Sequence, residues 1–117
     1  MQIIVDDDNV RINFNIAEKI LGMHGSFTIS LNNISYIHTD VPKQSFKELR
    51  LPGTCFPGLI KAGTYFTNRG REFWYTTRNN PFLNIELKNG FYKRIILSFN
   101  ENESIKNKIR DKIKPNN

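Results

Sequence analysis

Two predicted β-hairpins follow each other between Gly63 and Phe99, and they constrain the fold more than any other feature. The first joins Gly63–Phe66 to Glu72–Thr77 through Asn68-Arg69-Gly70, and the second joins Leu83–Lys88 to Tyr92–Phe99 through Asn89-Gly90. An Asn-Gly pair between alternating apolar runs is the strongest local hairpin signal, because both residues tolerate the positive φ of a tight turn. We therefore expect a late antiparallel meander.

Earlier strands are predicted wherever apolar and polar side chains alternate. They cover Ile3–Val5, Val10–Ile16, Phe27–Leu31, Ile34–His38 and Leu59–Phe66. Residues 17–23 are ambiguous, since Ile16, Ile20 and either Leu21 or Met23 also suit one face of a short helix. From 39 to 58 the alternation is lost, and Pro and Gly residues indicate a long connection. A connection of this length is usually functional or mobile.

The C-terminal residues predict one amphipathic helix, from about residue 101 to 114. Ile105, Ile109 and Ile113 recur every four residues and form one apolar stripe, which must pack against the sheet. Asn100 and Glu103 have the spacing of a capping box. The fold class is therefore mainly β, one domain over residues 1–117, with strands within 2–99 and a helix at the end.

Composition bears on the location of the chain. Its 117 residues contain no run of about 18 apolar residues, so no membrane span is expected. The first residues do not resemble a secretory leader. Cys55 is the single cysteine, which is typical of a reducing compartment. We expect a cytoplasmic protein.

The net charge of +6 is concentrated in the second half of the chain. Residues 1–59 carry five basic and six acidic side chains, whereas residues 60–117 carry twelve and five. Five of these cations crowd the predicted helix: Lys106, Lys108, Arg110, Lys112 and Lys114. The helix dipole favours cations at that end, and this explains much of the excess. The alternative is a surface that meets phosphate groups of lipid or nucleic acid.

Several segments together resemble a family of small bacterial PH-like (pleckstrin-homology-like) proteins. They are Pro52–Gly58, Ala62–Tyr65, Gly70–Trp74 and Leu83–Leu87, with upstream matches at Glu18–His24 and Phe27–Leu31. The resemblance covers roughly residues 10 to 113. Cys55 stands where the family usually has histidine, and Ser30 stands where it usually has proline.

This resemblance implies a PH-like split barrel. Such a fold has about seven antiparallel strands in two nearly orthogonal sheets, with a C-terminal helix closing one open corner. The family has no established activity, and its superfold generally serves as a docking scaffold. The resemblance therefore implies a fold and little about function.

No catalytic, metal or cofactor site is predicted. His24 and His38 are the only histidines, and neither has Cys or Glu at ligand spacing. The run Asp6–Asp8 lacks the glycine and final glutamate of a calcium loop, so a solvated turn is expected. Cys55 has no basic neighbour in sequence that would activate it.

One surface could carry a ligand or partner. If Phe73 and Tyr75 face the core, Trp74 lies on the outer face near the cations Arg69, Arg71 and Arg78. An aromatic ring with guanidinium groups can stack on a ligand or bind an anion. The alternative, which we favour, is that Trp74 packs beneath the long connection.

The predicted function is that of a non-enzymatic binding or protein-interaction module, with an unknown protein or peptide as partner. PH-like sheets can pair with a peptide through an exposed strand edge. Peripheral contact with an anionic membrane or a phosphate ligand, through the basic half, is the second interpretation. Nucleic-acid binding on a basic, aromatic sheet is the third. The oligomeric state stays open.

Overall fold

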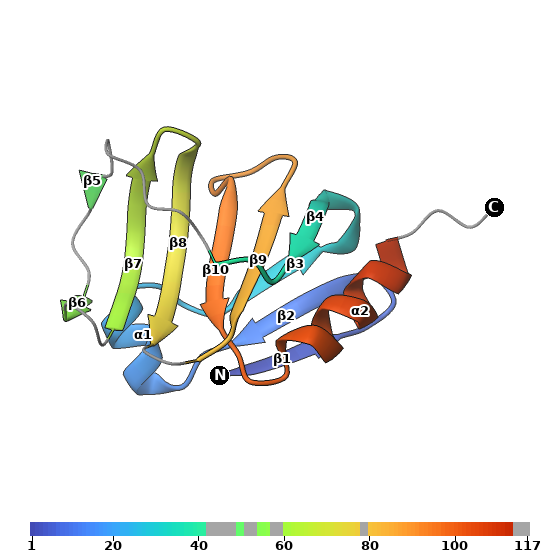
Figure 1. Cartoon of the computed structure of the whole chain (residues 1–117), viewed down its shortest axis with the longest axis horizontal. Coiled ribbons are helices and arrows are strands. Elements are labelled where there is room, and N and C mark those ends of the chain that lie inside the picture. The colour runs from blue at the N-terminus through green and yellow to red at the C-terminus, as the bar shows by residue number, and fades with distance from the viewer. Residues whose placement is uncertain (42–48, 51–53, 57–59, 78–79, 114–117) are drawn as a thin grey trace.

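The computed structural model describes residues 1–41, 49–50, 54–56, 60–77 and 80–113. Ten strands in these ranges form two sheets, and a C-terminal helix lies beside them (Figure 1). The prediction of a mainly β fold with one C-terminal helix is confirmed. The sheets do not close into a barrel.

The smaller sheet is antiparallel, in the order β1 (Gln2–Val5), β2 (Asn9–Asn13) and β3 (Phe27–Ser30). In β2 the predicted alternation is confirmed, since Val10 and Ile12 are buried and Arg11 is exposed. Asp6 closes the β1–β2 turn, because its Oδ1 accepts the amides of Asp8 and Asn9. These backbone hydrogen bonds lower the pKa of the Asp6 carboxyl.

The larger sheet has seven strands in the order β4–β9–β10–β8–β7–β5, and β6 also pairs with β7. The long strands are β4 (Ile34–His38), β7 (Ile60–Thr67), β8 (Gly70–Thr77), β9 (Phe82–Leu87) and β10 (Arg94–Ser98). Both predicted hairpins are present, as β7–β8 and β9–β10. The predicted antiparallel meander is wrong where they meet, because β10 returns between β9 and β8 and runs parallel to β8.

The predicted long connection contains two short strands. β5 (Leu49–Arg50) and β6 (Thr54–Phe56) each pair with β7. Strands of two or three residues are too short to display an alternating pattern, which is why the sequence did not predict them. The rest of the connection from 42 to 59 lies outside the described residues, so whether it has a functional role is untested.

Both faces of β8 are buried. Phe73 and Tyr75 belong to the main core between the two sheets. On the opposite face Trp74 packs with Tyr65 and Ile96 in a second apolar cluster. The larger sheet is thus covered on both sides at its centre.

Residues 16–23 resolve into the short helix α1 (Ile16–Gly22). Asn15 and Glu18 form a reciprocal capping box at its start, which ends β2 earlier than predicted. The predicted apolar face is wrong: Ile16 and Ile20 are 77% and 68% exposed. The helix instead docks through Gly22, where a Cβ would approach Phe73 to 3.0 Å.

Helix α2 (Asn102–Ile113) packs against β1, β4, β9 and the one-turn helix η1 (Leu31–Asn33). The predicted stripe is confirmed, with Ile105 and Ile109 buried and Ile113 half-buried against the core. The predicted Asn100–Glu103 capping box is not formed. The Glu103 amide donates to Asn102 Oδ1 instead, and the Asn102 side chain donates to the Phe82 carbonyl.

Candidate binding cleft at the edge of strand β3

β3 is the outer strand of the smaller sheet, and among the strands that the structure describes it pairs only with β2. Next to it, the Leu31 amide donates to the Asp8 carbonyl at 2.9 Å, on the β2 side. Backbone groups of successive strand residues point to alternate sides, so the amides of Thr28 and Ser30 point away from β2. Within the described residues neither amide has a backbone partner. β3 therefore presents an open strand edge.

A cleft of about 560 Å³ follows this edge. It is lined by residues 27–30 of β3, by Asn33, and by side chains of the β9–β10 hairpin. All four β3 residues line it, although alternate side chains point to opposite faces of a sheet. The cleft must therefore run along the strand edge and not over one face. Its volume is typical of a small-molecule or side-chain binding pocket.

Aromatic rings form the end of the cleft nearest Phe27. The His24 ring stacks on Phe27, with centroids 4.1 Å apart and 10° between the planes. The Tyr92 ring meets Phe27 edge-on at 5.7 Å, and its hydroxyl lies 2.8 Å from Thr64 Oγ1. Each ring is held by its neighbours, so this apolar wall exists before any ligand arrives.

Phe91 lines the cleft at its rim, and Arg71 packs against Phe91. The guanidinium carbon of Arg71 lies 3.6 Å from the centroid of the Phe91 ring, and Nη1 donates to the Phe91 carbonyl at 2.8 Å. Phe91 is 63% exposed. The neighbouring turn is tied down, because the Lys93 amide donates to the Arg71 carbonyl at 2.7 Å. An exposed aromatic ring is thus fixed beside a cation at the cleft mouth.

Asn33 joins the other end of the cleft to the β9–β10 turn. Its side chain donates to the Asn89 carbonyl at 2.7 Å and accepts the Asn89 amide at 2.9 Å. The Asn33 carbonyl accepts the Lys88 amide at 2.8 Å. These three bonds fix the spacing between the end of β3 and the hairpin.

The predicted ligand surface consists of Trp74 and the cations Arg69, Arg71 and Arg78. The structure does not bring these side chains together on one exposed patch. Trp74 is buried at 3% exposure, with Nε1 donating to Glu72 Oε1 and Lys61 Nζ lying 3.7 Å from the ring centroid. Of the two interpretations of Trp74, the favoured one, a buried side chain, agrees with the structure, and the exposed one is wrong. Much of the long connection that was expected to cover Trp74 lies outside the described residues. Arg71 packs against Phe91 at the cleft rim and Arg69 is exposed in the β7–β8 turn, while Arg78 lies outside the described residues.

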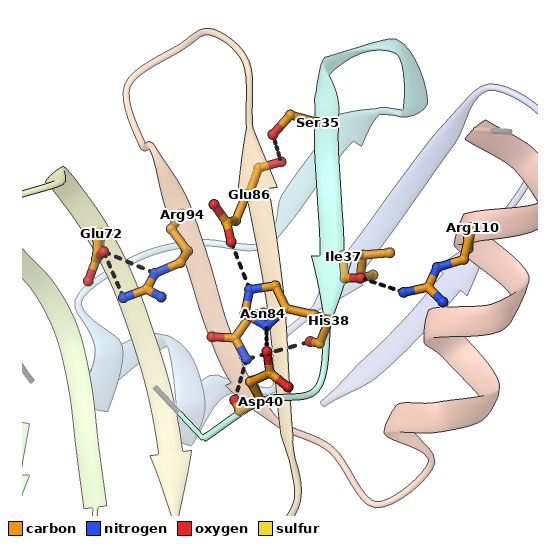
Figure 2. Close-up of polar contacts among 9 residues, drawn as sticks. All are labelled: Ser35, Ile37, His38, Asp40, Glu72, Asn84, Glu86, Arg94 and Arg110. Atoms are coloured by element: carbon orange, nitrogen blue, oxygen red, sulfur yellow. Dashed lines mark hydrogen bonds and ion pairs between the residues drawn. The ribbon is translucent and has the colours of Figure 1, made fainter. Parts of the chain in front are cut away.

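A row of polar side chains crosses the face of the larger sheet that points away from the main core (Figure 2). Glu72 is fully buried and accepts Nε and Nη2 of Arg94 through one oxygen, while its other oxygen accepts Trp74. Both carboxylate oxygens of Glu72 therefore accept hydrogen bonds from buried side chains of the same sheet. This pair fixes β8 against β10.

The two histidines of the chain, His24 and His38, make contacts in different parts of the structure. His38 Nε2 lies 2.7 Å from Glu86 Oε2, and Nδ1 lies 3.4 Å from Asp40 Oδ2 (Figure 2). His24 belongs to the aromatic wall instead. Within the described ranges no three His, Cys, Asp or Glu side chains are arranged to hold a metal ion. The side chain of Cys55, on β6, is not among the described ones.

The sequence pointed to part of this cleft. Phe27–Leu31 carries no charged residue, which is unusual for an outer strand and indicates an unprotected edge. Tyr92 is predicted only as the first residue of a strand, and the prediction gives Phe91 no role. Two aromatics directly after Asn89-Gly90 could have indicated a ring displayed by the turn, because the tip of a hairpin has no core to enter.

Models of protein families, curated proteins and solved structures contain no match to this chain. The resemblance to small bacterial PH-like proteins therefore stays a prediction. Of the helices that the structure describes, none has the length and apolar character required to cross a membrane.

Proposed function

We propose that the protein is a cytoplasmic, non-enzymatic binding module that takes up an extended segment of a partner protein. The segment would add as a further strand to the free edge of β3. Two features that occur together carry this proposal. The amides of Thr28 and Ser30 have no backbone partner among the described residues, and an apolar cleft runs along them. Backbone hydrogen bonds would supply affinity, and the cleft would select alternate side chains.

The test uses proline at Ser30, a change that removes one edge amide without disturbing the β2–β3 ladder. Ser30 has φ −64°, close to the value of about −65° that proline requires. Peptides selected from a random library against the unmodified protein should bind Ser30→Pro much more weakly. They should bind Ser30→Ala normally, because alanine keeps the amide.

Selected peptides should also shift the NMR signals of Thr28, Ser30 and Phe91. Peptides that bind Ser30→Pro as tightly as the unmodified protein, or that shift only distant residues, would contradict strand addition at β3. A circular dichroism spectrum of Ser30→Pro serves as the check that the variant is folded.

A second candidate is contact with an anionic membrane through the same end of the molecule. The exposed Phe91 ring and the neighbouring cations Arg71, Lys88 and Lys93 support it. Vesicles containing phosphatidylserine should then retain the protein, and Phe91→Ala should reduce retention. We expect weak, salt-sensitive retention at most at an ionic strength of about 0.15 M. Tight retention at that salt would reverse the order of the two candidates.

We also propose that the fold is a variant of the PH-like split barrel. Two sheets with a C-terminal helix against them support this. The parallel pair β8–β10 departs from the fully antiparallel pattern. An experimental structure with two nearly orthogonal sheets would support the relationship.

A further inference from the structure

The turns beside the cleft carry four cations that have no acidic partner among the described residues. Arg69 and Arg71 belong to the β7–β8 turn and the start of β8, and Lys88 and Lys93 flank the β9–β10 turn. None of the four belongs to an ion pair in the part of the chain that the structure describes. The two turns lie at the same end of the molecule (Figure 1).

Two carboxylates on the strands that lead into these turns are already used. Glu72 is bound to Arg94, and Glu86 lies against His38. Both are on the face of the larger sheet opposite the core (Figure 2). The cleft rim therefore carries uncompensated positive charge, which favours an anionic ligand.

We propose that the segment that adds to β3 is acidic, with carboxylates at both ends of a short apolar core. This inference rests on the proposed function. The cations lie toward both ends of β3. Lys88 lies toward the Ser30 end, because its backbone amide donates to the Asn33 carbonyl. Arg71 lies toward the Phe27 end, because it packs on Phe91, which contacts Tyr92 and through it Phe27. Side chains of an added strand alternate, so every second residue enters the cleft and should be apolar.

A second copy of this chain does not fit the same edge. Two copies paired through β3 would bring two sets of rim cations together, and like charges facing each other across paired strands are destabilising. β3 itself contributes no carboxylate to offset them, since its sequence is Phe-Thr-Ile-Ser. The occupant is therefore a different protein segment, of opposite charge.

The experiment compares three synthetic peptides with the same alternating Ile/Thr core, flanked by glutamates, glutamines or lysines. Binding is followed by NMR titration of the Thr28 and Ser30 signals. The glutamate peptide should bind about fivefold more tightly than the glutamine peptide, and the lysine peptide more weakly still. The difference should vanish near ~1 M salt, where screening acts over about 3 Å.

Two double variants that lower the net charge equally show which cations cause the preference for the glutamate peptide. Lys88→Gln/Lys93→Gln should remove most of the preference for the glutamate peptide. Lys106→Gln/Lys108→Gln lowers the net charge equally on α2 and should preserve the preference. Equal losses in both variants would show a general charge effect and overturn the inference.

The two proposals fail in different ways. If the glutamine peptide shifts the β3 signals and binds as tightly as the glutamate peptide, the acidic partner is wrong and strand addition stands. If none of the three peptides shifts β3, while a fatty acid such as decanoate fills the cleft, strand addition is wrong and the acidic segment is wrong with it.

Discussion

Two regions carry positive charge, and they use it differently. On α2, Lys106 pairs with Glu103, Lys112 pairs with Asp7, and Arg110 donates to the Ile37 carbonyl. Beside the β3 cleft, Arg71 and its three neighbouring cations form no ion pair with a carboxylate of the described residues. Three of the four cations that the structure describes on α2 thus make contacts within the molecule, and Lys108 is the exception. The cations at the cleft are available to a partner.

This difference separates structural charge from functional charge. The contacts of α2 hold the helix to the β1–β2 turn and to β4, and the helix dipole adds to them. Of the four cleft cations, Arg71 is the one whose side chain makes a hydrogen bond or ring contact with other described residues, since it lies over the Phe91 ring and donates to the Phe91 carbonyl. Substitutions of the α2 cations should therefore lower the stability of the protein, whereas substitutions of the cleft cations should weaken partner binding.

The largest effect should come from the buried cation. Arg94 is 5% exposed and bound to Glu72, so Arg94→Met leaves an uncompensated carboxylate inside the protein. We expect a loss of about 3–5 kcal/mol in the free energy of unfolding. The matched change Arg71→Met should cost about 1 kcal/mol or less, because Arg71 is half-exposed. Urea unfolding curves measure both losses. Equal losses would contradict the distinction between a buried, ion-paired Arg94 and a cleft cation, Arg71, that contributes little to stability.

The next effect concerns the apolar stripe of α2. Ile109 is fully buried, and Ile109→Ala should lower the free energy of unfolding by about 2–5 kcal/mol. The control is Ile16→Ala on α1, where the side chain is 77% exposed and the change should stay within about 0.5 kcal/mol. A small loss at Ile109 would mean that α2 is not docked as described.

The smallest effects are pH-dependent and belong to the exposed charges around the β1–β2 turn. The amides of Asp8 and Asn9 lower the pKa of Asp6, so its contribution is present above the ordinary carboxyl pKa of 3.8 and is lost as the pH falls through the folded value. The bond to Asp7 raises the pKa of Lys112, so that contribution is present below 10.5 and is lost as the pH rises through the folded value.

Asp6→Asn should therefore flatten the acid limb of a stability–pH curve, and Lys112→Met should flatten the alkaline limb. Thermal unfolding across the pH range measures both. A Lys112→Met curve that differs from the unmodified protein mainly at acid pH would contradict the assignment.

The sequence predicted the hairpins well because their signals are local. Asn89-Gly90 and the alternation on both sides of it need no information from the rest of the chain. The order of the strands is not local, and so the parallel contact between β8 and β10 could not be predicted from spacing. The same limit applies to Ile16 and Ile20, whose helical spacing indicates a face but not whether anything covers it.

The residues of the candidate site were harder to predict than the hairpins, because tertiary contacts bring them together. Arg71 was singled out for its charge, but its aromatic neighbour is Phe91 from another hairpin and not the adjacent Trp74. Trp74 is buried because the larger sheet has apolar side chains on both faces. The shortage of charge in Phe27–Leu31 was the one local signal of an open edge.

Amide hydrogen exchange of β3, with and without the glutamate-flanked peptide, tests the open edge most directly. If the peptide adds as a strand, the amides of Thr28 and Ser30 acquire hydrogen-bond partners, and their exchange should slow markedly. Protection confined to residues 104–113 of α2, with both β3 amides unchanged, would contradict the proposal that this edge receives the partner.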